Sequence, residues 1–205
     1  MTKVIGLAGG IGSGKSTISR YLTELGAVLI DADKAGHEVF TDTEAWRELV
    51  VAFGQEILTP GGEIDRKKLG EVVFGNAESL SRLNKIIRPR MIALMKARIE
   101  EYRRQGANMV VVDCVMPAPP EVIRTEGRWT PQVDEVWVIA VSKATVIKRL
   151  KEQRGLEEEQ AVARMSSQLS DEERVKYADA VINNDGDLDE VRAKVKELWK
   201  RLEVV

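Results

Sequence analysis

Close to its N-terminus the chain reads Gly9-Gly10-Ile11-Gly12-Ser13-Gly14-Lys15-Ser16. This stretch fits the pattern G-x-x-x-x-G-K-[ST], with Gly9 and Gly14 as the two fixed glycines. The run Val4–Ala8 before it is apolar and predicts a buried parallel strand. Ser16–Leu25 carries apolar residues at helical spacing and predicts a helix that Gly26 ends. A glycine-rich turn directly between a strand and a helix predicts a phosphate-binding loop rather than an ordinary turn.

Each part of this motif corresponds to a part of a bound nucleoside triphosphate. The glycines let backbone N–H groups point inward as an anion nest, and the start of the helix adds its dipole. We expect Lys15 to reach the β- and γ-phosphates, Ser16 to offer its hydroxyl to Mg²⁺, and Thr17 to contact the α-phosphate. The predicted nucleotide-binding residues of the loop are Gly9, Gly10, Gly12, Ser13, Gly14, Lys15, Ser16 and Thr17. The motif alone does not say what becomes of the γ-phosphate.

The next part of the chain changes character from strand to helix. Ala27–Ile30 predicts a second strand, which completes a strand–helix–strand unit. No convincing strand follows until after Gln105. Helical patterns instead cover Ala45–Phe53, Arg66–Phe74, Ser79–Ile87 and Pro89–Arg104. We interpret residues 34–105 as a helical lobe inserted into the sheet domain.

Sheet character then returns. Strands are predicted over Met109–Val112, Val136–Val141 and Ala180–Ile182, with a proline-rich loop between the first two. Helices are predicted over Ala144–Arg154, Glu157–Leu169 and Asp189–Leu202. Alternating strands and helices predict an α/β fold, with a nucleotide-binding core made of residues 1–33 and 106–205.

Three carboxylates follow predicted strands, where ligands of open α/β sheets bind. Asp31 and Asp33 come after the second strand, and one of them can accept the proton of an attacking hydroxyl. Either could instead cap a helix that begins near Lys34. Asp113 ends the third strand, where a carboxylate can hold Mg²⁺ directly or through water. It could also be a plain strand-end carboxylate.

Composition excludes several other classes of protein. The 205 residues carry 31 Lys plus Arg and 33 Asp plus Glu, a net charge of −2, which argues against a protein that coats nucleic acid. One cysteine, Cys114, and one histidine, His37, exclude a disulfide framework and a cysteine or histidine metal cluster. No apolar run approaches the roughly 18 residues of a membrane span. We therefore expect a cytoplasmic protein.

Five basic residues mark two consecutive predicted helices: Lys148, Arg149, Lys151, Arg154 and Arg164. A kinase needs a lid, here about residues 144–170, that brings positive charge to the phosphates and excludes water. Most of these residues fit a solvated helix face equally well. Arg149 is the one that we predict to be catalytic. His37 lies one turn beyond Asp33, and a lone histidine is more often structural.

Taken together, these residues resemble the dephospho-CoA kinase family, over nearly the whole chain. The resemblance begins with the phosphate loop and continues with Ile30-Asp31-Ala32-Asp33, which is its most specific sign, and His37. It extends to Arg149-Leu150, Arg154, Arg164, Gln168, Ala178-Asp179 and Asn184. The chain departs from the family at Arg88-Pro89, where His-Pro is usual, and at Pro117–Glu121, where the apolar middle residues are missing.

The resemblance implies ATP-dependent phosphorylation of the ribose 3′-hydroxyl of dephospho-CoA, with Mg²⁺ as cofactor. It implies a P-loop core with a five-stranded parallel sheet, a helical substrate lobe and a helical lid. The implied catalytic residues are Asp33, Lys15 and Arg149, and Asn184 joins the nucleotide site. The implied substrate-binding residues are Asp31, Asp33, His37 and Arg66, and the implied metal-binding residues are Ser16 and Asp113. We expect a monomer that binds neither nucleic acid nor membrane.

Two other functions share the loop. A different small-molecule P-loop kinase, acting on a nucleoside monophosphate or a sugar, would not need the Asp-Ala-Asp segment. A GTPase-like switch would normally carry Asn-Lys-x-Asp after a late strand. Val141-Ser142-Lys143-Ala144 lacks both the asparagine and the aspartate.

Overall fold

The structure is a computed structural model that describes residues 1–114 and 133–203. The proline-rich loop expected between the third and fourth strands, including Pro117–Glu121, lies outside these residues. The chain divides into two compact units. The first unit consists of Met1–Ile30 and Ile99–Val205, and the second consists of Asp31–Arg98.

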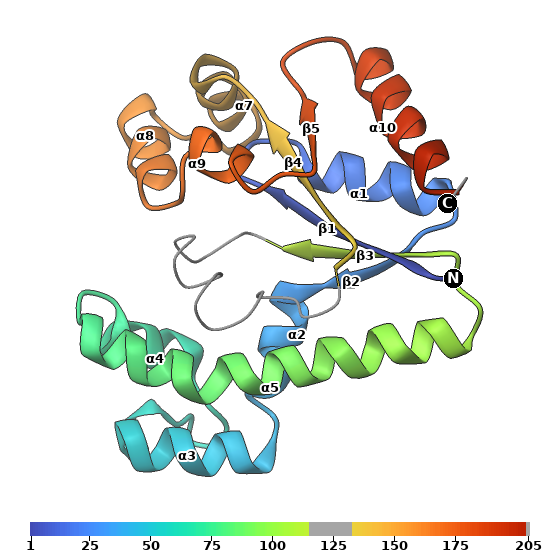
Figure 1. Cartoon of the computed structure of the whole chain (residues 1–205). Helices are drawn as coiled ribbons and strands as arrows, with labels where there is room; N and C mark the ends of the chain where they lie inside the picture. Colours follow the sequence, from blue (N-terminus) through green and yellow to red (C-terminus); the bar gives the residue numbers. More distant parts are fainter. Residues whose placement is uncertain (115–132, 204–205) are drawn as a thin grey trace. The chain divides into compact units, whose positions relative to one another are not determined.

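The first unit is built on a five-stranded sheet with the order β2-β3-β1-β4-β5. Its strands are β1 (Lys3–Gly9), β2 (Val28–Asp31), β3 (Met109–Cys114), β4 (Glu135–Ala140) and β5 (Ala180–Asn183). The central strand β1 runs parallel to both β3 and β4, and β4 runs parallel to β5. The predicted α/β class and the five-stranded parallel sheet are confirmed. In this arrangement the loop after β1 emerges at the middle of the sheet (Figure 1).

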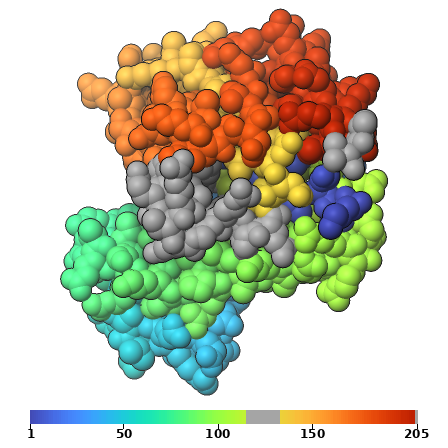
Figure 2. Space-filling view, in the orientation of Figure 1, coloured from blue at the N-terminus to red at the C-terminus, as the bar shows by residue number. Residues whose placement is uncertain are grey.

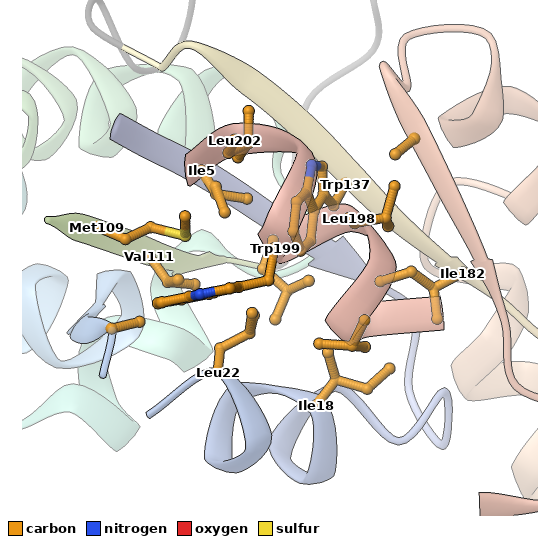
Figure 3. Close-up of a cluster of buried hydrophobic side chains, with 14 of the residues drawn as sticks. Ile5, Ile18, Leu22, Met109, Val111, Trp137, Ile182, Leu198, Trp199 and Leu202 are labelled. Atoms are coloured by element: carbon orange, nitrogen blue, oxygen red, sulfur yellow. The ribbon is translucent and has the colours of Figure 1, made fainter. Parts of the chain in front are cut away.

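Alternation along β1 gives the sheet two different faces. Ile5 and Leu7 point into the main apolar cluster, together with residues of α1 (Lys15–Glu24) and α10 (Leu188–Glu203). Trp137 and Trp199 both belong to this cluster, and Leu22 lies beside Trp199 (Figure 3). Ala8 points to the other face and packs with Val138. The helix that follows the phosphate loop is therefore held by the core of the protein.

Three more helices of the first unit follow β4 and lead towards β5 (Figure 1). They are α7 (Lys143–Arg154), α8 (Glu158–Ser166) and α9 (Asp171–Val175). A single helix over Glu157–Leu169 was expected, but α8 ends at Ser166 and the separate helix α9 was missed. The reason is a capping box, in which Ser170 and Glu173 bond each other's backbone and start a new helix.

The second unit is helical, as expected, and has its own apolar core. It contains α2 (Ala32–Val39), α3 (Thr43–Phe53), the 3₁₀ turn η1 (Gln55–Ile57), α4 (Arg66–Val73) and most of α5 (Ala77–Arg104). The core consists of Leu49, Phe53, Ile57, Leu69, Val73 and Ile86. None of the described helices is long and apolar enough to cross a membrane.

The prediction of two helices, Ser79–Ile87 and Pro89–Arg104, is wrong, because α5 continues through Pro89. Proline inside a helix costs about 3 kcal/mol, since it removes one hydrogen bond and crowds the preceding turn. Contacts of the next residue, Arg90, offset this cost. Arg90 donates to Glu48 of α3 at 2.9 Å and lies 3.5 Å from Asp42, the N-cap of α3, so α5 is fixed to α3 directly after the proline. The local sequence predicted that the helix ends at Pro89, but tertiary contacts keep it continuous.

The role of the main cluster in holding α1 can be tested with two leucines. Leu22→Ala should lower the free energy of unfolding by about 2–5 kcal/mol, because Leu22 is fully buried. Leu25→Ala removes the same atoms where the side chain is 36% exposed, and we expect less than about 1 kcal/mol. Urea denaturation followed by tryptophan fluorescence measures both. Equal losses would show that the cluster does not anchor this helix.

Candidate active site

The phosphate loop joins the end of β1 to the start of α1. Gly12 and Gly14 have φ angles of 73° and 85°, in the left-handed region that favours glycine. The N–H of Ser13 donates to the carbonyl of Gly10 at 3.1 Å, which closes the turn. Among the described residues the N–H groups of Gly12, Gly14 and Ser16 have no hydrogen-bond acceptor. The loop thus offers backbone donors to an anion.

Side chains from two other elements hold the loop by its carbonyl oxygens. Asn184, directly after β5, donates its side-chain amide to the carbonyl of Ser13 at 2.6 Å. Arg149 of α7 donates to the carbonyl of Gly12 at 3.3 Å and to that of Asn184 at 2.7 Å. These contacts place Arg149 and Asn184 against the loop, as support for its backbone. The catalytic contact expected of Arg149 with the transferring phosphate stays a prediction.

Asp185, the residue after Asn184, ties the same two elements together. Its carboxylate accepts from the N–H of Ser142, at the start of α7, with both oxygens at 2.9 Å. Hydrogen bonding with Ser142 holds the pKa of Asp185 below its usual value. The ionised carboxylate therefore fixes the end of β5 relative to the helix that carries Arg149.

Lys15 and Asp113 meet on the other side of the loop. The ammonium of Lys15 pairs with Oδ1 of Asp113, and the hydroxyl of Ser19 donates to Oδ2 at 2.6 Å. Ser19 was not among the predicted site residues. It lies one turn after Lys15, so a helical reading of the motif could have found it. Asp113 accordingly positions the lysine that the motif assigns to the phosphates.

Oxygen ligands for a metal are also present at this end of the loop. Ser16 is exposed in the first turn of α1, while the N–H of Thr17 donates to the carbonyl of Gly14 at 2.9 Å. Within the described part of the chain, no group of three or more His, Cys, Asp or Glu side chains could cage a metal. Mg²⁺ usually binds through one or two protein oxygens together with substrate phosphates and water.

Gln168, in the connection between α8 and α9, contacts the first half of the loop. Its side-chain oxygen accepts from the N–H of Ile11 at 2.9 Å. The sequence contained Gln168 as part of the family pattern, but gave no role for it. The structure shows one of the loop's backbone donors already bound to a neutral oxygen.

The two predicted acids of the second unit lie at the start of α2. Asp31 is the N-cap of this helix, and its side chain accepts from the N–H of Lys34 at 3.0 Å. The alternative reading of Asp31 as a helix cap is thus confirmed. Asp33 lies in the first turn of the helix and not on a continued strand. It is exposed, and among the described residues its carboxylate has no hydrogen-bond donor.

His37 and Arg66, both predicted to bind substrate, line one pocket within the second unit. The pocket has a volume of about 550 Å³ and includes the aromatic side chains of Phe40 and Trp46. The indole N–H of Trp46 donates to the carbonyl of Gly62 at 2.8 Å, which fixes the ring against the turn before α4. Sequence reasoning missed Trp46, because nothing in the α3 pattern distinguishes an aromatic that lines a pocket from one in a core.

Comparison with known proteins identifies the family. The family described as dephospho-CoA kinase matches residues 3–190. The dephospho-CoA kinase of Dehalococcoides mccartyi is 43% identical over 203 residues, which cover 98% of this chain and 99% of that protein.

Solved structures agree with this match. TT1252 from Thermus thermophilus superposes with a TM-score of 0.76 at 27% identity, over 98% of both chains. Dephospho-CoA kinase from Campylobacter jejuni gives a TM-score of 0.62 at 26% identity, over 98% of this chain and 97% of that chain. Because the family match runs from the first strand into the last helix, and not only through the phosphate loop, the chain belongs to the dephospho-CoA kinase family.

Proposed function

We propose that this chain transfers the γ-phosphoryl group of ATP to the ribose 3′-hydroxyl of dephospho-CoA, giving coenzyme A and ADP. The observation that carries the proposal is the family match over nearly the full length, in a chain whose phosphate loop has free backbone donors. Kinases of this class do little covalent chemistry themselves. They position two substrates and stabilise the charge of the transferring group.

The donor side of the reaction lies in the first unit. The N–H groups of the loop and the start of α1 bind the phosphate oxygens, as the dipole and free donors of a helix N-terminus allow. The ammonium of Lys15 stabilises the negative charge that builds on the γ-phosphoryl oxygens and the β–γ bridging oxygen. Asp113 pairs with this ammonium and holds it in place.

Mg²⁺ would be bound by the oxygens of Ser16 and Asp113, directly or through water, together with the phosphates. When bound, it neutralises charge on the β- and γ-phosphates. Both residues supply the hard oxygen ligands that this ion prefers.

The acceptor side lies in the second unit. Asp33 takes the proton of the 3′-hydroxyl while the hydroxyl oxygen forms a bond to Pγ. The bond between Pγ and the β–γ bridging oxygen breaks in the same step. The electron pair of that bond leaves with ADP. Asp33 suits this role because it is exposed and free of other donors, whereas the carboxylate of Asp31 caps α2.

The pocket of the second unit is suited to the rest of the acceptor. Arg66 offers a planar, permanently charged group to the diphosphate, and His37 adds a ring nitrogen. Phe40 and Trp46 offer ring faces to the adenine or to the apolar part of the substrate. A volume of about 550 Å³ is within the usual range for sites that bind small molecules.

We further propose that the enzyme acts in the cytoplasm as a monomer and binds no nucleic acid. The support is that one chain supplies every group used above, and that its net charge is −2.

The identity of the acceptor is tested by product analysis. Dephospho-CoA should stimulate ATP turnover and yield coenzyme A, while AMP, shikimate and gluconate should not, because the pocket of the second unit must be filled. Chromatography of the nucleotides after reaction with each acceptor measures this. Robust phosphorylation of AMP or of a sugar acid, with none of dephospho-CoA, would refute the assignment.

The identity of the base is tested by two isosteric substitutions. Asp33→Asn removes the basic oxygen, and kcat should fall by about 10²–10⁴-fold while ATP affinity stays within a few fold. Asp31→Asn should cost less in rate, because asparagine caps a helix as well as aspartate does. Steady-state kinetics at saturating Mg-ATP and dephospho-CoA compare the two. If Asp31→Asn is inactive and Asp33→Asn is nearly normal, Asp31 is the base and the assignment to Asp33 is wrong.

A further inference from the structure

Arg174, in the short helix α9, is a buried cation that the reaction described above does not use. Its side chain is 2% exposed. One nitrogen, Nη1, donates to the carboxylate of Asp171 at 2.7 Å. The other two, Nε and Nη2, are buried and have no acceptor among the described residues. The guanidinium thus carries two donors that nothing in the described chain satisfies.

Such an arrangement is unfavourable without a further partner. A guanidinium stays charged at any physiological pH, so burial cannot neutralise it. Asp171 balances the charge, but it receives only Nη1 of the guanidinium, and its other oxygen accepts from the N–H of Val141 at 3.0 Å. Buried donors without acceptors are costly, and more so on a charged group. The two nitrogens therefore call for a further acceptor, which an anion bound at this place would supply.

The position of Arg174 indicates which anion this is. Nη1 lies 2.9 Å from the point where a Cβ on Gly10 would be, so the guanidinium packs against the backbone of the phosphate loop. Arg174, Gly10, Ile11 and Gln168 line a common cavity of about 410 Å³. All of these residues belong to the first unit, in which α8 and α9 form the orange surface of Figure 2.

A second observation points to an oxygen ligand in this cavity. The N–H of Ile11 already donates to an oxygen there, the side-chain carbonyl of Gln168, at 2.9 Å. Gln168 is neutral and sits on the connection between α8 and α9, so a phosphoryl oxygen can replace it. Replacement would move this connection and uncover the donors of Arg174.

Asp171, Glu172 and Glu173 also line the cavity, and the start of α9 offsets part of their negative charge. Glu173 accepts from the N–H of Ser170 at 3.2 Å within the capping box of α9. Glu172 lies in the same first turn, and hydrogen bonds from its own N–H and from Ser170 lower its pKa. Both carboxylates face the positive end of a helix.

We propose that Arg174, together with the N–H of Ile11, binds the terminal phosphoryl group of the nucleoside triphosphate. Arg174 therefore acts at the first half of the phosphate loop, as Lys15 does at the second half. Two of its donors are buried and uncommitted, whereas both Nη groups of Arg149 are bound to backbone carbonyls. The inference rests on the proposed function only in taking ATP as the ligand.

The test compares two nucleotides that differ by the terminal phosphoryl group. Calorimetry with Mg²⁺ gives dissociation constants for ADP and for the β,γ-imido analogue of ATP, which is not hydrolysed. Arg174→Met should raise the dissociation constant of the analogue by about 10–100-fold, as expected for lost hydrogen bonds to a charged group. It should raise that of ADP by less than about threefold. Arg174→Lys keeps the charge without the planar fork, so its dissociation constant for the analogue should lie between those of Arg174→Met and wild type.

A matched control and a stability measurement make the outcome decisive. Arg192→Met removes an arginine of the same unit that stacks on Tyr21, and both dissociation constants should stay unchanged. If Arg174→Met is unfolded at the assay temperature, the comparison of the two nucleotides is made with Arg174→Lys instead. Equal weakening of ADP and the analogue would overturn the proposal, as would no weakening at all. The assay needs no acceptor, so a failure to phosphorylate dephospho-CoA would refute the proposed function and leave this inference standing.

Discussion

The hydrogen bonds to the carbonyl oxygens of Gly12 and Ser13 are the constraint on which the nucleotide site depends. A peptide group points its N–H and its C=O in opposite directions, so the N–H of Gly14 can face phosphate only if the carbonyl of Ser13 turns away. The neighbouring carbonyl of Gly12 is also bonded outside the loop, to Arg149. Those carbonyls need donors from elsewhere, because buried polar groups without partners are costly. Arg149 and Asn184 are those donors.

The order of the strands makes this support possible. Gly12, Arg149 and Asn184 are far apart in sequence, and they meet because β1, β4 and β5 are consecutive neighbours in one parallel sheet. Asp185 then bonds the start of α7 to the end of β5. On the opposite side β3 pairs with β1 and brings Asp113 to Lys15. The sheet thus positions the loop through its neighbours as well as through the strand that precedes it.

Much of this could be predicted from the sequence. The strand, glycine-rich loop and helix at the N-terminus share one strong pattern, and the five strands and the helical character of residues 34–105 followed from periodicity. Pro89 was misjudged because long-range contacts of Arg90 outweigh the local signal, whereas α9 was missed although its capping box of Ser170 and Glu173 is a local signal. The contacts of Arg149 and Arg174 could not be predicted, since each joins residues whose proximity depends on the whole fold, whereas the place of Ser19 one turn after Lys15 could have been found from helical spacing. The roles predicted for the site residues, including Asp33 and Asp113, stay predictions.

The importance of the loop's outward hydrogen bonds is tested most directly by binding to an Asn184→Ala variant. The substitution removes the donor to Ser13 while leaving every group that touches phosphate in place. Calorimetry should show ADP and the β,γ-imido analogue of ATP both weakened by about tenfold, and by the same factor, because the whole loop loses its orientation. Unchanged affinity for both nucleotides, in a variant that remains folded at the assay temperature, would contradict this role of Asn184.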